Sequence, residues 1–417
     1  MSEKELHSKI CVVQSIKPPF SEARDEVVDN DASYKLACNF ATIFARDNDL
    51  IAVKLKISDG YIAYISKFNP WHEKDDVYIN KIEEYLRNMS KDSSKKSKAN
   101  PDALTSEVLS YCSYKLESRI KKLYNDLIRN PDEEYIKSFI GYASANLKGF
   151  EPKKLHYVNK LDISVICQSY YEQLDKIDNE IPQKFLGHLR KVASYVASAI
   201  NITKCASNVK YKNLFSNIEL HMIDSIGPVI SKSRILSWEN VIKSFVRNHE
   251  DYERFRDECL KNDPIATRLK RLYYHYHDGE FKLDDDNIEI LVFVHAEMKL
   301  LVNMIDQKDK SKSFIAVSSA GCCYLCELYI DFARKRGYNI ITSGKCGRIR
   351  DTWKFPPVAS IDFRFESLKY ILKNLDRIIE NKIKLVTDAD SDSDTTNSPD
   401  SHRQEIYRFI MGDDFQP

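Results

Sequence analysis

Residues 288–344 alternate short apolar runs with segments of helical periodicity, and this pattern constrains the fold of the chain most strongly. Ile288–Val294 is a nearly continuous apolar run, and Phe314–Val317 is a second one. A helical pattern follows each of them, with Gly337 as a stop after the second helix and Tyr338–Thr342 as a third strand. Buried strands that alternate with amphipathic helices are typical of a mainly parallel sheet covered by helices. The sequence therefore predicts an α/β fold.

A segment near the N-terminus has the pattern of a helix followed by a β-hairpin. Apolar residues at helical spacing in 32–44 predict the helix, and Leu50–Ile57 and Tyr61–Phe68 predict the two strands. The Asp59-Gly60 pair between the strands is a strong turn signal, because glycine tolerates the positive φ that such turns need. Helical periodicity and long charged stretches dominate the sequence from about Ala103 to His277.

Composition excludes several classes of protein. Lys and Arg number 63 and Asp and Glu 62, so the net charge by itself indicates no nucleic-acid partner. Of the ten cysteines only Cys322, Cys323 and Cys326 cluster, which favours a reducing compartment with one metal or redox site over a disulfide framework. Residues 1–20 lack the pattern of a secretory signal, and no apolar run is long enough to span a bilayer. We expect an intracellular protein, cytoplasmic or nuclear, with no membrane anchor.

Two motifs with metal-binding side chains stand at the starts of predicted helices. His295 and Glu297 open the first helix, and Cys323–Cys326, a Cys-x-x-Cys motif, opens the second. We expect both motifs to emerge at the carboxyl ends of adjacent strands, so that the two helix starts can face one shared point at that edge of the sheet. One imidazole and two thiolates would bind Zn²⁺ and leave its fourth position open to water, and Glu297 is placed to take the proton of that water. A redox role for Cys-x-x-Cys alone would leave His295 and Glu297 unexplained.

This spacing has the form of the zinc deaminase signature, His-x-Glu followed by Cys-x-x-Cys. On these motifs, and on Gly347–Trp353 leading to Pro356-Pro357, the segment from about 287 to 360 resembles the cytidine-deaminase-like superfamily, in particular its fungal and rickettsial branch. The chain departs from the usual pattern at Cys322, where the superfamily has proline, and at Cys346, where the branch tends to have histidine. Cys322 therefore places an extra thiol beside the site, and a shift in which cysteine binds stays open.

The resemblance implies a cytidine-deaminase-like three-layer α/β/α core and zinc-dependent hydrolytic deamination of a cytosine or adenine base. Zn²⁺ would be held by His295, Cys323 and Cys326, with Glu297 as the catalytic residue. The superfamily core begins with a helix and a β-hairpin, and the predicted N-terminal segment has that form. We therefore expect a split domain, with a helical insertion and an acidic tail that is disordered. The expected parts are residues 32–70 (first part of the core), 75–285 (helical insertion), 286–385 (second part with the zinc motifs) and 386–402 (disordered tail).

Four further residues are candidates for substrate binding. In such deaminases an asparagine near the first strands often contacts the substrate, and Asn69 would be that residue, with an ordinary Asn-Pro turn as the alternative. Arg348, Arg350 and Trp353 form a basic and aromatic segment suited to phosphate and base contacts, with a plain surface loop as the alternative. These residues favour a nucleotide or single-stranded nucleic acid as substrate. The rival hypothesis is a catalytically inactive deaminase fold that retains zinc and binds a protein partner through the helical insertion.

Overall fold

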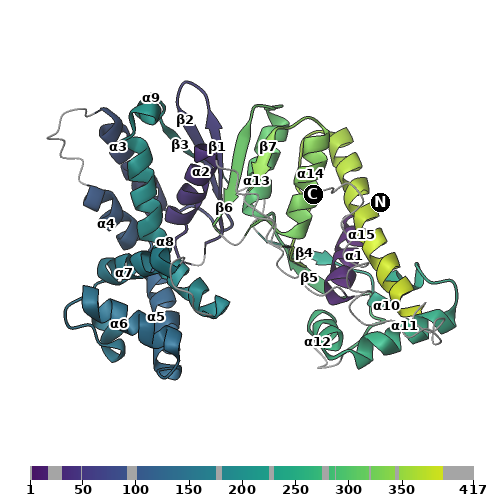
Figure 1. Ribbon diagram of the computed structural model, residues 1–417. Helices are drawn as coiled ribbons and strands as arrows, with labels where there is room; N and C mark the ends of the chain where they lie inside the picture. The colour runs from purple at the N-terminus through teal and green to yellow at the C-terminus, as the bar shows by residue number, and fades with distance from the viewer. Residues whose placement is uncertain are drawn as a thin grey trace, which may run out of the picture.

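A five-stranded sheet lies at the centre of the protein in the computed structural model (Figure 1). The structure describes residues 2–16, 31–47, 49–91, 101–174, 181–224, 230–274, 281–286, 288–318, 321–342 and 347–387. In spatial order the strands are β3 (Glu219–Met222), β2 (Tyr61–Lys67), β1 (Ile51–Ile57), β6 (Ser313–Val317) and β7 (Ile340–Thr342). β1 is antiparallel to both of its neighbours, whereas β3 and β7 run parallel to theirs. The fold is therefore α/β with a mixed sheet.

Two groups of helices flank this sheet (Figure 1). Alternate residues of β1 point to opposite faces, so Val53 and Leu55 join one apolar core and Ala52 joins the other. The first group comprises α2 (Ala32–Ile43), α3 (Glu73–Lys91), α4 (Pro101–Tyr111), α5 (Ser113–Arg129), α6 (Glu134–Asn146), η1 (Pro152–Tyr157), α7 (Lys160–Gln173), α8 (Gln183–Ala206), η3 (Val209–Tyr211) and α9 (Lys212–Ser216). The second comprises α1 (Glu3–Ile16), α10 (Trp238–Lys243), α11 (His249–Lys261), α12 (Asp263–Leu272), α13 (Ala296–Asp306), α14 (Tyr324–Lys335) and α15 (Ile361–Thr387).

The predicted β-hairpin is present, but its glycine serves a different purpose from the one expected. β1 and β2 pair with Ile57 opposite Tyr61, which leaves a tight turn between them. Gly60 does not have the positive φ that the turn signal predicted. A Cβ atom at Gly60 would instead lie 2.2 Å from the carbonyl oxygen of Asn217, just before β3. Glycine is required here because another stretch of backbone passes close to it.

Gly60→Ala is expected to lower the free energy of unfolding by about 1–3 kcal/mol, because the new methyl group forces two backbone segments apart. Gly141→Ala in α6 and Gly187→Ala in α8 are matched controls, since neither Cβ atom would meet anything within 4 Å. Both should be neutral or more stable by up to about 1 kcal/mol, as alanine favours helix. Urea denaturation of the three variants measures the difference, and equal midpoints would contradict the role assigned to the close approach.

The strand before the histidine motif is not part of the main sheet. The predicted strand Ile288–Val294 forms β5 (Glu289–Val292), which pairs antiparallel with β4 (Ser231–Arg234) in a separate two-stranded sheet. The prediction that the strands before the two motifs are neighbours in a mainly parallel sheet is therefore wrong. The physical reason is that β5 is only partly buried, with Leu291 54% exposed. Such a strand is stable in a small sheet at the surface and does not have to lie between two strands of the main sheet.

Residues 75–285 are mostly helical, but they also supply strands. They contribute β3 to the main sheet and β4 to the small sheet, and the helices before and after these strands lie on opposite sides of the main sheet (Figure 1). Helix α15 runs to Thr387, so the predicted tail begins inside it, and the rest of 386–402 falls outside the described residues. No described helix combines the length and apolar character that crossing a membrane requires. None of the cysteines within the described ranges forms a disulfide.

Candidate metal centre

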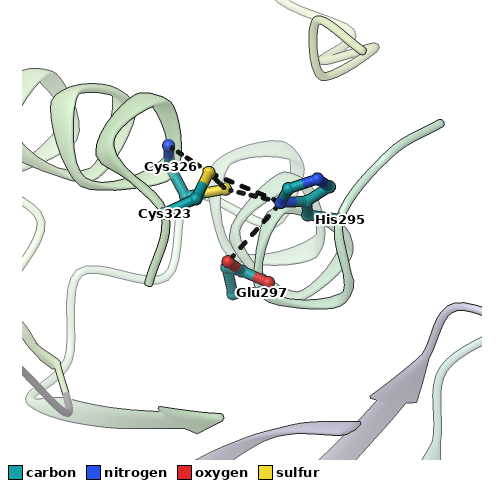
Figure 2. A group of neighbouring side chains, drawn as sticks. All are labelled: His295, Glu297, Cys323 and Cys326. Carbon is teal, nitrogen blue, oxygen red and sulfur yellow. Dashed lines mark hydrogen bonds and ion pairs between the residues drawn. The ribbon is translucent and has the colours of Figure 1, made fainter. Parts of the chain in front are cut away.

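The two predicted motifs meet at the starts of α13 and α14 (Figure 2). His295 is the N-cap residue of α13, with φ −64° and ψ 152°, and Glu297 lies in the first turn. Cys323 is the N-cap residue of α14, where its sulfur accepts the backbone N–H of Cys326 at 3.5 Å. In both helices the extended backbone of the cap residue directs a metal-binding side chain across the helix start. The convergence predicted from the sequence is confirmed, although β5 and β6, the strands that precede the two motifs, lie in different sheets.

The distances within this cluster suit a small metal ion. The sulfur atoms of Cys323 and Cys326 are 3.3 Å apart, and His295 Nδ1 lies 3.5 Å and 3.3 Å from them. Glu297 Oε1 is 3.9 Å from the same nitrogen, and all four ligand atoms lie within 4.8 Å of one another. A tetrahedral zinc site with ordinary bond lengths separates its nitrogen and sulfur ligands by roughly 3.5–3.8 Å. The donor set therefore fits Zn²⁺.

Burial makes the charges of these side chains interact strongly. Burial alone would raise the pKa of Cys323, but a hydrogen bond from Cys326 and the positive charge of His295 lower it to about 5. Burial alone would lower the pKa of His295, but the thiolate of Cys323 and the carboxylate of Glu297 raise it to about 10. The same imidazolium outweighs burial to hold the pKa of Glu297 below its ordinary value. Burial and Cys323 together raise the pKa of the Cys326 thiol.

Zinc binding at pH 7 is expected to release about two protons and to become tighter as the pH rises. Without metal, His295 and Cys326 carry protons at this pH because their pKa values are raised, whereas Cys323 is already a thiolate. Both protons must leave before the imidazole and the second thiolate can bind metal. Calorimetric titration in buffers with different ionisation enthalpies counts the protons. Cys322→Ser should give the same count, and binding that is independent of pH would contradict this ionisation state.

Trp353 contacts the cluster through Cys326. Its side chain is completely buried, and the indole N–H donates a hydrogen bond to Cys326 Sγ at 3.2 Å. A ring with no exposed surface is poorly placed to stack on a base, which was the role predicted for it. Arg348 and Arg350, by contrast, are exposed on the same segment. The neighbouring Lys345 and Cys346 lie outside the described residues.

The end of the hairpin reaches the histidine motif. Asn69 follows β2 and donates a hydrogen bond through its side-chain amide to Asp49. The ring centroids of Phe68 and Phe293 are 4.2 Å apart, and those of Phe293 and the His295 imidazole are 5.4 Å apart. Asn69 is therefore in a segment that contacts the surroundings of the metal ligands, at the same edge of the sheet as the predicted site.

A buried lysine that was not singled out in the sequence connects these two segments. Lys299 lies one helical turn after His295 and is 3% exposed, and its ammonium group donates to the carbonyl oxygens of Lys67 at 2.7 Å and Phe68 at 3.4 Å. Burial, helped by the charge of Lys67, lowers the pKa of Lys299 to about 8. Lys67 in turn pairs with Asp75, which is also fully buried. No sequence signal marks Lys299, because a single lysine in a helix is ordinarily a surface residue.

Comparison with known proteins agrees with this geometry. Residues 294–357, which span both motifs and the Trp353 segment, match the model of a family described as "OTT_1508_deam:-like deaminase". No curated protein and no solved structure matches the chain. The matched residues begin one position before His295 and include both motif cysteines. This segment of the chain thus resembles a deaminase-like family, and the naming of that family agrees with the fungal and rickettsial branch that the motifs predicted.

Proposed function

We propose that this protein is a zinc-dependent hydrolytic deaminase that acts on a cytosine or adenine base, with a nucleotide or single-stranded nucleic acid as substrate. The observation that carries the proposal is the convergence of one imidazole nitrogen, two sulfurs and one carboxylate within 4.8 Å. The deaminase family match over the same residues supports it independently. The exposed side chains of Arg348 and Arg350 support a phosphate-bearing substrate, because guanidinium groups bind phosphate well.

Each side chain of the cluster has a separate task in this reaction. His295 Nδ1 and the sulfurs of Cys323 and Cys326 would hold Zn²⁺, whose Lewis acidity makes a water molecule nucleophilic at neutral pH. Glu297 accepts one proton of that water at its carboxylate and delivers it to the ring nitrogen, and it then carries the second proton from the new hydroxyl group to the departing amino group. A carbon–oxygen bond forms, the carbon–nitrogen bond breaks, and ammonia leaves. Glu297 is only 7% exposed, so bulk water competes little for the transferred proton.

We also propose that residues 32–70 and 286–385 form one deaminase core with three layers, and that 75–285 is an insertion in it. The pairing of β1 with β6, which joins residue 54 to residue 315, supports a single core built from both parts. The hydrogen bonds from Lys299 to the end of β2 support it further. In this arrangement Asn69 is the substrate contact supplied by the first part.

A screen of substrate classes tests the activity. Purified protein loaded with zinc is incubated with single-stranded DNA, single-stranded RNA, nucleotides and nucleosides. Ammonia release and the mass change of the base are measured. We expect product from one polymer or nucleotide class and less from free nucleosides, which lack the phosphate that Arg348 and Arg350 would bind. If fully loaded protein deaminates none of these cytosine or adenine compounds, the proposed activity is wrong.

One observation favours the rival function of an inactive fold with a retained zinc site. The carboxylate of Glu297 lies within the same 4.8 Å cluster as the other donors, so it is close enough to become a fourth ligand and close the site. Such a protein would act through a surface of its insertion, where α4, α7 and α8 border a cavity of about 520 Å³ lined mostly by apolar side chains. Glu297→Ala separates the two functions, because it loses zinc only if Glu297 is a ligand.

A further inference from the structure

The segment 348–354 connects the two halves of the metal centre through backbone hydrogen bonds. The N–H of Tyr324, the residue after the first motif cysteine, donates to the carbonyl of Arg348 at 2.9 Å. Phe293, two residues before the motif histidine, donates to Thr352 at 2.8 Å and accepts from Lys354 at 3.0 Å. One segment therefore fixes the position of the cysteine helix relative to the histidine helix.

Trp353 is the residue of this segment that contacts the cluster. Its side chain is 0% exposed, and its ring packs near Tyr329 and Phe355 with centroid distances of 6.4 Å and 6.1 Å. These neighbours restrict the orientation of the indole ring, and its N–H donates to Cys326 Sγ at 3.2 Å. The hydrogen bond is thus made by a donor that packing holds in place.

The two motif sulfurs receive their hydrogen bonds from different sources. Cys323, at the N-cap of α14, accepts a backbone N–H of the helix start. Cys326 is the third residue of that helix, beyond the cap, and is fully buried. Its sulfur contacts Cys323 and His295, which belong to the cluster themselves, and it accepts the indole N–H of Trp353 from outside the cluster. Two thiolates and the carboxylate of Glu297 carry more negative charge than one divalent ion balances. A donated N–H withdraws part of the charge of a metal-bound thiolate and stabilises it.

We propose that Trp353 is a positioning residue of the metal centre, which holds the thiolate of Cys326 through its indole N–H and thereby strengthens metal binding. The inference rests on the metal site of the proposed function, but it concerns the affinity for the ion and is independent of the substrate. It replaces the substrate contact predicted from the sequence with a role inside the protein.

Trp353→Phe tests the role, since it keeps an aromatic ring and removes the N–H group. We expect the dissociation constant for Zn²⁺, measured by competition with a chelator, to rise by about 10- to 100-fold. The thiolate-to-metal charge-transfer band of the Co²⁺-substituted protein should also shift. Trp238→Phe is the matched control, because Trp238 is equally buried in the same half of the molecule and its indole nitrogen has no hydrogen-bond partner in the described part of the chain. The control should keep the wild-type affinity and band.

A measurement on the unmodified protein guards against a variant that folds poorly. The chain has three tryptophans, so its indole N–H signals are few in a nitrogen–proton correlation spectrum. One of them, assigned by its absence in Trp353→Phe or by selective labelling, should shift when zinc is added. An unshifted Trp353 signal, or equal zinc affinities for Trp353→Phe and wild type, would overturn the inference. Wild-type protein that binds no zinc would instead overturn the proposed function.

Discussion

Glu297→Gln is expected to reduce the rate of deamination by about 10²- to 10⁴-fold while zinc stays bound. Glutamine keeps the size of the side chain but does not accept a proton, and burial of this position prevents bulk water from replacing it. Ammonia release under saturating substrate gives the rate, and inductively coupled plasma mass spectrometry gives the zinc content of the same sample. A reduced rate with zinc still bound identifies Glu297 as a proton carrier, whereas loss of zinc would identify it as a metal ligand.

Glu327→Gln provides the matched control for this result. Glu327 is a second buried glutamate, near the start of the neighbouring helix α14, but its carboxylate pairs with Arg334 at 3.0 Å and is not part of the metal cluster. Its replacement should cost stability and leave the rate per folded molecule close to that of wild type. A Glu297→Gln protein as active as wild type would rule out the role assigned to Glu297.

Cys323→Ser is expected to abolish zinc binding at micromolar concentrations of metal. A serine hydroxyl stays protonated at neutral pH, so the site loses one of its two anionic sulfur ligands. Zinc should then no longer stabilise the protein. Wild type, in contrast, should gain about 2.7 kcal/mol when free zinc exceeds its dissociation constant a hundredfold. Thermal unfolding with and without zinc measures this difference.

Cys322→Ser tests whether the ligands are the cysteines of the observed cluster. Cys322 is the adjacent residue and is equally buried, but it does not belong to the group of four donors. The variant should retain zinc and its stabilising effect. If Cys322→Ser loses zinc and Cys323→Ser keeps it, the ligand set is shifted by one residue from the one that the structure indicates.

The residues of the site could be predicted from the sequence because the geometry of each of its two halves is local. His295 and Cys323 each precede an amphipathic helix, and a cap residue directs its side chain across the helix start whatever precedes it. The hairpin was predictable for the same reason, since a two-strand pattern around Asp59-Gly60 needs no distant partner. The helix stop at Gly337 is also local, and its φ of +87° confirms it.

Features that depend on distant contacts were not predictable. β4 has the polar sequence Ser-Lys-Ser-Arg, so nothing in its composition marks it as the partner of β5. Helix α1, whose Leu6 and Ile10 are fully buried against the second group of helices, was likewise not indicated. Trp353 stands among basic residues, a pattern typical of an exposed binding loop, yet long-range packing buries its ring beside Cys326. Sequence identifies the chemical groups, whereas burial decides which of them face a substrate.

The most direct test of the central claim is a crystal structure of the zinc-loaded protein with anomalous diffraction recorded at the zinc absorption edge. The proposed centre predicts an anomalous peak within bonding distance of His295 Nδ1 and of the sulfurs of Cys323 and Cys326. The carboxylate of Glu297 should lie beside the ion without binding it, and the fourth position should hold water. A peak elsewhere, or a fourth position occupied by Glu297 or by another side chain, would contradict the account.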